Sequence, residues 1–170
     1  AATVRKVKGI LNKLTPEKFE RLLSQFIPLV TSYEVLSETI SQVFESAVAQ
    51  PTFVAMYADL CAELDAVLPE FDDPASGERT NFRKMLANTC QAEYEASGSA
   101  RAAVRALSGA EREEGERRAK QRLLGCIRLI AQLFCKGLVN DRVMSLILRD
   151  LLGAQGASAA EPSVENVEAA

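Results

Sequence analysis

Apolar residues recur every three to four positions along most of this chain, and no stretch alternates apolar and polar residues as a half-buried strand does. A spacing of this kind gives each helix one apolar stripe that must be buried against a neighbour. Six such stripes follow one another between residue 19 and residue 152. The chain is therefore predicted to be all-α.

Helix start signals divide the stripes. Thr15 is suited to cap a helix, Pro16 to occupy its first position and Glu17 to face the positive end of its dipole. Pro51 is expected to begin the third helix in the same way. Asn140 is expected to cap the sixth helix, which Gly153 would end.

Taken in pairs, the six helices predict three hairpins at about 15–50, 51–96 and 111–152, a length typical of HEAT-type repeats stacked in a curved solenoid. A compact six-helix bundle would show the same stripes and is the alternative. Residues 97–116 are rich in Ala, Gly, Ser and charge, which predicts a flexible insertion with only transient helix. Residues 153–162 are predicted to be a linker, and residues 163–170 the start of a truncated fourth repeat.

Composition argues against most enzyme classes. The chain has no histidine, so the histidine-dependent nucleophilic triads and most catalytic zinc sites are excluded, and it lacks the glycine-rich phosphate loops. We expect no catalytic residue, no metal and no cofactor. No apolar run approaches the roughly 18 residues of a membrane helix, and no signal-peptide pattern is present, so we expect no membrane association.

The four cysteines form no C-x-x-C pair, and each lies among apolar residues at helical spacing. They are predicted to be free thiols in the core, which fits a reducing compartment and a cytoplasmic location. These cysteines are Cys61, Cys90, Cys126 and Cys135.

Charge is segregated along the chain. Residues 1–21 hold six basic and two acidic residues, whereas residues 22–78 hold ten acidic residues and no basic one. Residues 79–152 are again basic, with fourteen basic and eight acidic residues. Solvated surfaces usually intersperse the two signs, so the acidic stretch is either a plain solvated face or a docking face for a basic partner.

Three segments carry a resemblance to a known family. They read VKGILNKLTPEKF at residues 7–19, NFRKMLANTCQ at residues 81–91 with EYE at 93–95, and LGCIRLIAQLF at residues 124–134. In this order and near this spacing they closely resemble the middle domain of the eukaryotic translation initiation factor 4 gamma family. The resemblance covers residues 4–170. Cys126 departs from it, since asparagine is more usual there, and residues 97–116 are shorter and richer in Ala and Gly.

The resemblance implies a crescent of five HEAT repeats, of which this chain holds the first three and the beginning of the fourth. It implies a scaffold of translation initiation that binds RNA, the DEAD-box helicase initiation factor 4A through its C-terminal lobe, and possibly initiation factor 3. Two alternatives remain: a related adaptor of RNA decay or splicing that binds another DEAD-box helicase, and a plain RNA-binding helical module.

The family's helicase contacts are carried over best at Asn12 and Lys13, just before the first repeat. Arg83 and Lys84 match a family signature and are further helicase candidates. The alternative for these residues is a cap or a solvated side chain.

Four cations are candidate contacts for the phosphates of messenger RNA, with plain solvation as the alternative. They are Arg5, Lys6, Lys8 and Arg79.

Overall fold

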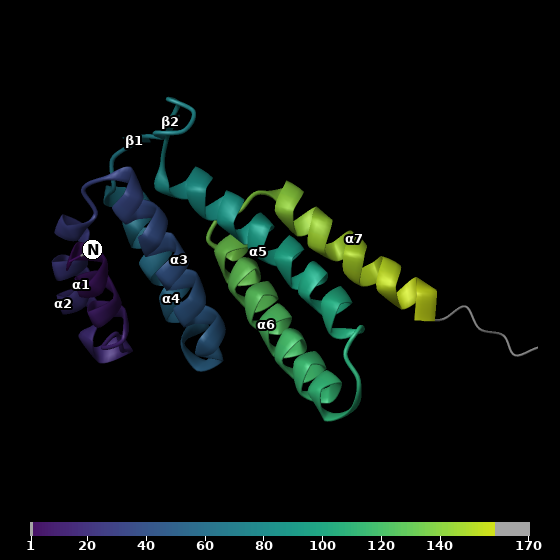
Figure 1. The fold of residues 1–170 in the computed structure, drawn as a ribbon. Coiled ribbons are helices and arrows are strands. Elements are labelled where there is room, and N and C mark those ends of the chain that lie inside the picture. The colour runs from purple at the N-terminus through teal and green to yellow at the C-terminus, as the bar shows by residue number, and fades with distance from the viewer. Residues whose placement is uncertain (1, 159–170) are drawn as a thin grey trace, which may run out of the picture.

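The computed structural model describes residues 2–158, and side chains through residue 153. Seven α-helices account for most of the described chain (Figure 1). They are α1 (Ala2–Leu11), α2 (Phe19–Phe26), α3 (Tyr33–Ala49), α4 (Val54–Val67), α5 (Phe82–Val104), α6 (Gly109–Cys135) and α7 (Asp141–Ser158). Three single-turn 3₁₀ helices at Pro16–Lys18, Ile27–Leu29 and Pro51–Phe53 flank α2 and precede α4. The described strands are β1 (Phe71–Asp72) and β2 (Arg79–Thr80), an antiparallel pair in the α4–α5 connection.

The predicted all-α class is confirmed. We call the successive helix pairs α2–α3, α4–α5 and α6–α7 the first, second and third hairpin, and their assignment as three repeats stays a prediction. The hairpins stack side by side, with α1 and α2 at one end of the array and α6 and α7 at the other (Figure 1). α6 packs against α3, α4 and α5, so the third hairpin contacts both earlier ones. One contiguous core therefore runs through the described chain.

Polar caps begin three of the helices. The Ser32 hydroxyl accepts a hydrogen bond from the Val35 amide at 3.3 Å. The side-chain oxygens of Asn81 and Asn140 accept from the amides of Lys84 at 2.9 Å and Val143 at 3.3 Å. Each bond satisfies an amide that the helix leaves unpaired, and the cap predicted at Asn140 is confirmed.

The start predicted at Thr15 differs in detail. Thr15 has the extended backbone of a cap, but its hydroxyl makes no capping hydrogen bond, and Pro16 opens a 3₁₀ turn before α2 begins at Phe19. Proline suits this turn because it has no amide hydrogen to satisfy.

Sequence reasoning missed α1. Val4, Val7 and Leu11 recur at helical spacing, but the basic residues between them make the apolar stripe difficult to recognise. Val7 and Leu11 are buried, and α1 packs mainly against α3. This helix therefore covers the apolar face that the first hairpin would otherwise expose.

Two predictions about irregular segments were wrong. The insertion expected over residues 97–116 is helical except for a turn at 105–108, because α5 continues to Val104 and α6 begins at Gly109. Alanine and the long charged side chains in this segment have high helix propensity, which outweighs Gly98 and Gly115. α7 likewise passes through Gly153 to Ser158, so residues 153–158 of the expected linker are helical. The predicted fourth-repeat start at 163–170 lies outside the described residues.

A close approach of two helices joins the first and third hairpins. A Cβ atom placed on Gly125 of α6 would lie 2.9 Å from Val48 Cγ1 and 3.0 Å from the Val48 carbonyl oxygen of α3. Only glycine lets α6 lie this close to the α3 backbone. The junction therefore depends on a residue with no side chain.

None of the described helices combines the length and apolar character that crossing a membrane requires.

Candidate functional site

α1 presents three of the predicted RNA contacts on its outer face. Arg5, Lys6 and Lys8 are exposed, while Val7 and Leu11 point inward and hold the helix on the core. Helical geometry separates these two sets, since residues three and four apart share a face. The basic side chains are thus displayed on an anchored helix.

The two leading helicase candidates lie in the turn that follows. The amide of Asn12 donates to the Lys8 carbonyl and that of Lys13 to the Ile10 carbonyl, each at 3.0 Å. Leu14 is buried directly after them. The turn is therefore fixed on both sides, and the side chains of Asn12 and Lys13 are exposed on it.

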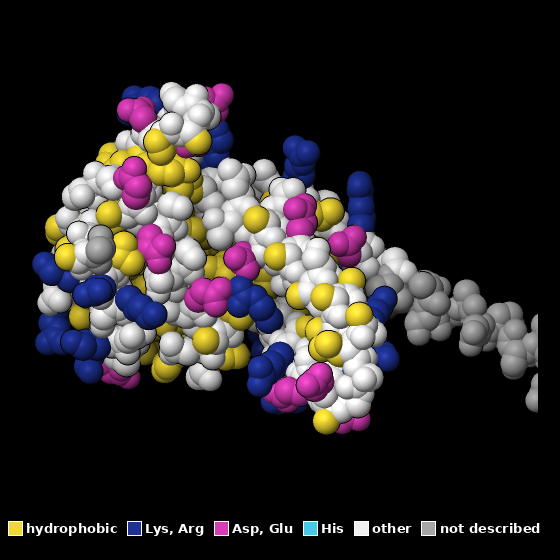
Figure 2. Space-filling model, in the orientation of Figure 1, with side chains coloured by type: hydrophobic (Ala, Val, Ile, Leu, Met, Phe, Trp, Pro, Cys, Tyr) yellow, Lys and Arg dark blue, Asp and Glu magenta, His cyan; other side chains and the backbone are white. Residues whose placement is uncertain are grey.

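These cations form one surface with two more from the start of the first hairpin. We define the N-terminal basic surface as Arg5, Lys6, Lys8, Lys13, Lys18 and Arg21. Dark-blue side chains gather over α1 and α2 in Figure 2. Within residues 2–153, none of the six side chains makes an ion pair. Their charge is available to an incoming group.

A shallow groove lies between α1 and α2 within this surface. Lys6 and Lys13 stand on its rim, and Ile10, Leu22 and Leu29 contribute apolar lining. An acidic segment with an apolar face would fit such a groove by charge and by contact. The predicted contacts Lys6 and Lys13 thus line the same groove, although they are seven positions apart in the sequence.

Arg83, the third helicase candidate, is held differently. Its guanidinium donates to Asp65 Oδ2 at the end of α4, with the Nη2 atom at 2.6 Å and Nε at 3.2 Å. Nη1 also donates to the Gly137 carbonyl in the α6–α7 turn at 3.2 Å. Arg83 therefore ties the second hairpin to the third.

The remaining two candidates also face acids. Lys84 Nζ lies 3.6 Å from Glu78, and both side chains are exposed. The Nε atom of Arg79 on β2 lies 3.4 Å from Glu70 Oε2 and 3.9 Å from Asp72 Oδ1. These residues belong to the β1–β2 end of α5, which is separated from α1 and α2 in Figure 1.

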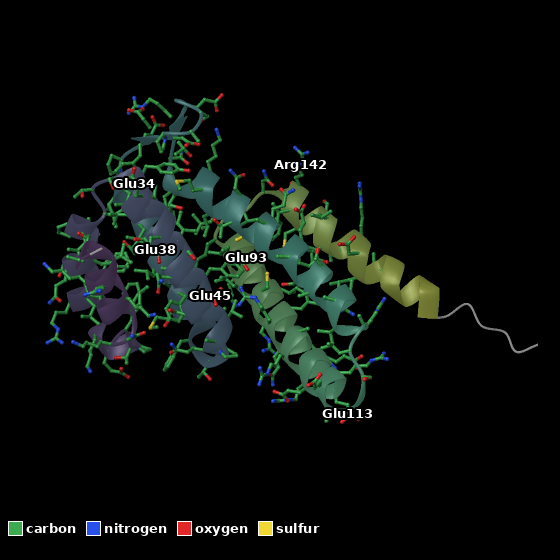
Figure 3. All side chains as sticks on the ribbon, in the orientation of Figure 1. Glu34, Glu38, Glu45, Glu93, Glu113 and Arg142 are labelled. Atoms are coloured by element: carbon green, nitrogen blue, oxygen red, sulfur yellow. The ribbon has the colours of Figure 1, made fainter. Side chains whose placement is uncertain are left out.

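Sequence reasoning missed Arg122 of α6, which bridges two other helices. Its guanidinium donates to both oxygens of Glu45 on α3, at 2.7 and 3.1 Å, and to Glu93 on α5 at 2.7 Å. Figure 3 shows Glu93 beside Glu45, at the end of a row of acids that includes Glu34 and Glu38 on α3. Hydrogen bonds to Glu45 raise the pKa of Arg122, and the same contact lowers the pKa of Glu45. No sequence signal marks this set, because its acids lie 77 and 29 residues from Arg122.

The acidic stretch of residues 22–78 supplies the partners of most of these bridges. Glu45, Asp65, Glu70, Asp72 and Glu78 pair as described, and Asp59 pairs with Lys136. Six of its ten acids therefore bind cations of residues 79–152 within the same chain. Glu45 and Asp59 pair with cations of the third hairpin, whereas the other four acids pair within the second hairpin.

Three of the four cysteines are buried thiols that burial makes harder to ionise. Cys61, Cys90 and Cys126 are free and buried, as predicted, whereas Cys135 is exposed, which corrects the prediction of a core position. Burial raises the pKa of Cys61 and of Cys126 to about 12 and also raises that of Cys90. A thiol that stays protonated at neutral pH is a poor nucleophile.

Comparison with known proteins agrees with this architecture. A family model described as the MIF4G domain matches residues 4–169. The chain is 38% identical over 177 residues to eukaryotic translation initiation factor 4G of Arabidopsis thaliana, covering 99% of this chain and 10% of that protein.

Two further relatives give the same result. The wheat (Triticum aestivum) eukaryotic translation initiation factor 4G is 36% identical over 190 residues, covering 99% of this chain and 12% of that protein. The human eukaryotic translation initiation factor 4 gamma 3 is 35% identical over 157 residues, covering 82% of this chain and 10% of that protein. The chain thus spans about a tenth of the length of these relatives. The family predicted from three sequence segments is confirmed, and the chain belongs to the MIF4G domain family.

Proposed function

We propose that this chain is a non-enzymatic scaffold domain of translation initiation that holds a DEAD-box helicase, initiation factor 4A, close to messenger RNA in the cytoplasm. The observation that carries the proposal is the N-terminal basic surface, whose cations make no ion pair within the described residues. Membership in the MIF4G domain family and the names of the relatives support the setting in translation initiation. A further contact with initiation factor 3 is part of the same proposal.

The helicase contact is assigned to the turn at Asn12 and Lys13. The side-chain amide of Asn12 can both donate a hydrogen bond to a partner backbone and accept one from it, and Lys13 brings a mobile cation to an acidic patch. The adjoining groove lets the same partner bury apolar atoms against Ile10 and Leu29. Held in this way, the C-terminal lobe of the helicase would be biased toward an arrangement that speeds its cycle, without chemistry from the scaffold.

Arg83 and Lys84 have unequal parts in this proposal. Arg83 already makes hydrogen bonds to Asp65 and Gly137, so a partner would have to replace them. Lys84 has only a loose, exposed pair with Glu78 and is free to turn toward a partner. We therefore keep Lys84 as a secondary helicase contact and assign Arg83 to the joint between hairpins.

The helicase proposal is tested by the double substitution Asn12→Asp with Lys13→Glu. Calorimetry against the isolated C-terminal lobe should show a loss of on the order of 2 kcal/mol of binding free energy if the pair is central to the interface. Lys120→Glu with Gln121→Glu makes the same change of charge on α6 and should leave the affinity nearly unchanged. Equal losses of affinity in the two variants would mean that only the net charge of the chain matters. An unchanged affinity in the Asn12→Asp, Lys13→Glu variant would mean that the helicase binds elsewhere.

RNA is assigned to Arg5, Lys6 and Lys8. Each phosphate neutralised on a single strand contributes a slope of about −0.7 in log affinity against log salt. With three or four contacts the slope should be roughly −2 to −3, and binding should be weak and show little sequence preference.

The matching variant is Arg5→Gln, Lys6→Gln, Lys8→Gln, which should bring that slope close to zero. Arg79 is also proposed as an RNA contact, but a weaker one, because Glu70 and Asp72 compete with a phosphate for its charge. Arg79→Gln should change the slope by much less than about 0.7. If Arg79→Gln changes the slope by about 0.7, Arg79 does contact a phosphate. If the triple variant leaves the slope unchanged, α1 is not part of the RNA site.

A further inference from the structure

Three serines in the sequence follow an arginine by three residues, a spacing that arginine-directed serine kinases recognise. These kinases bind the guanidinium with carboxylates, for which its planar donor geometry is well suited. The pairs are Arg21 with Ser24, Arg105 with Ser108, and Arg142 with Ser145. The spacing alone does not distinguish the three.

The structure separates them by backbone conformation. All three serines are exposed. Ser24 lies inside α2, where its hydroxyl donates to the Arg21 carbonyl at 2.8 Å, and Ser145 lies inside α7. Ser108 lies in the turn between α5 and α6 with φ −134° and ψ 159°, which is extended backbone.

We propose that Ser108 is a phosphorylation site for an arginine-directed serine kinase acting on the folded chain. Such an enzyme must lay the residues around the target along its own cleft, so it acts on an exposed turn, whereas a helix has to unfold first. In the turn itself, the amides of Ala106 and Leu107 make hydrogen bonds to the carbonyls of Ala103 and Val104, at 3.1 and 3.0 Å. Opening this segment disturbs the end of α5 and the first residues of α6, and leaves the rest of both helices in place.

The side chains needed for recognition are available. Ser108 precedes α6, but its hydroxyl makes no capping hydrogen bond, so phosphorylation of this hydroxyl removes no hydrogen bond from the helix. Arg105 is exposed and makes no ion pair within residues 2–153. The turn joins α5 to α6 at the ends of these helices that lie far from β1 and β2 (Figure 1). Both residues are exposed at this end of the molecule, where Arg105 lines a pocket with residues of α6 and with Leu151 of α7.

The reaction requires ATP as phosphoryl donor. Ser108 Oγ attacks the γ-phosphorus and forms a new P–O bond, while the bond from that phosphorus to the β–γ bridging oxygen breaks and ADP leaves. The hydroxyl proton passes to the catalytic aspartate of the kinase. The product carries a charge of about −1.5 to −2 directly before the amino end of α6, where the helix dipole favours an anion.

The experiment compares the three serines within one molecule. The folded chain is incubated with ATP and a purified serine kinase that requires arginine three residues before its target, and phosphate is mapped by mass spectrometry over time. Ser108 should be modified at least about tenfold faster than Ser24 and Ser145, because both of these wait for local unfolding. Peptides of residues 19–29, 103–113 and 140–150 should all be substrates at comparable rates.

Matched variants test the recognition step. Arg105→Gln should slow modification of Ser108, whereas Arg142→Gln, which makes the same change at the start of α7 (Figure 3), should leave the Ser108 rate unchanged. Ser108→Ala should remove the fast phosphate. Equal rates at the three serines of the folded chain, an unmodified Ser108, or a 103–113 peptide that the kinase ignores would each overturn the proposal.

Discussion

Two groups of cations in this chain are used in different ways. In the N-terminal basic surface, six cations make no ion pair within the described residues. In the hairpin junction, defined as Asp65, Arg83, Glu45, Glu93, Arg122 and the Val48–Gly125 contact, each cation is held by acids of another helix. The junction holds three acids beside its two arginines, so its cations are already paired, whereas the N-terminal basic surface has charge to offer a partner. A basic stretch in a sequence therefore has to be located in the fold before it is assigned to RNA or to a protein.

The largest effect is expected at the closest contact of the junction. Gly125→Ala would place a Cβ within 3.0 Å of the α3 backbone at Val48, so α3 and α6 must move apart. Overpacking of this kind should lower the free energy of unfolding by about 2 kcal/mol, measured by urea denaturation. Gly9→Ala in α1 is the matched control, since its Cβ would meet no atom within 4 Å. That variant should be neutral or slightly more stable, because alanine favours helix. Equal losses would mean that the junction has no special packing.

Arg122 tests the electrostatic part of the same junction. Arg122→Ala removes three hydrogen bonds and leaves Glu45 and Glu93 near each other without a cation. Because the side chain is 39% exposed, solvent screens the interaction, and we expect a loss of about 1 kcal/mol in unfolding free energy. Arg128→Ala, on the same helix and without an ion pair in the described part of the chain, should stay within about 0.5 kcal/mol of the parent. A similar loss from Arg128→Ala would contradict the contrast between paired and unpaired arginines.

A smaller, pH-dependent effect follows from Glu45. The hydrogen bond from Arg122 lowers the pKa of this carboxyl below its ordinary value of 4.5. A lowered folded-state pKa adds stability above the unfolded-state value, and that stability is lost as pH falls through the folded-state value. The difference in unfolding free energy between the parent and Arg122→Gln should therefore be full near pH 6 and shrink by a few tenths of a kcal/mol below pH 4.5. Urea titrations of both proteins at several pH values measure it. A difference that is constant with pH would assign the role of Arg122 to packing.

Local signals in the sequence explain why much of the fold could be predicted. The stripes of α2 to α7 and the cap at Asn140 depend on residues a few positions apart, which sequence patterns record directly. α1 was missed because Arg5, Lys6 and Lys8 interrupt its stripe. The end of α5 and the start of α6 differ from the prediction because alanine and charged residues, which are also typical of disordered segments, favour helix here.

The site divides along the same line. Asn12 and Lys13 could be placed from the helix start that follows them, and both are exposed as expected. The role of Arg83 could not, because Asp65 and Gly137 lie 18 and 54 residues away from it. Only tertiary packing brings such groups together, and one sequence alone does not show which residues far apart in the chain are close in space.

The smallest effect on stability is expected where the cations are free. Arg5→Gln, Lys6→Gln and Lys8→Gln together should change the unfolding free energy by less than about 0.5 kcal/mol, because no ion pair is lost and glutamine has nearly the helix propensity of lysine and arginine. Relief of repulsion among the three cations acts in the stabilising direction. Val7→Ala, on the buried side of the same helix, shows that the assay reports on α1 and should cost on the order of 2 kcal/mol. A loss above about 1 kcal/mol in the triple variant would mean that these cations stabilise the fold. The contrast with the junction would then fail, because α1 would be using its charge internally as Arg83 and Arg122 do.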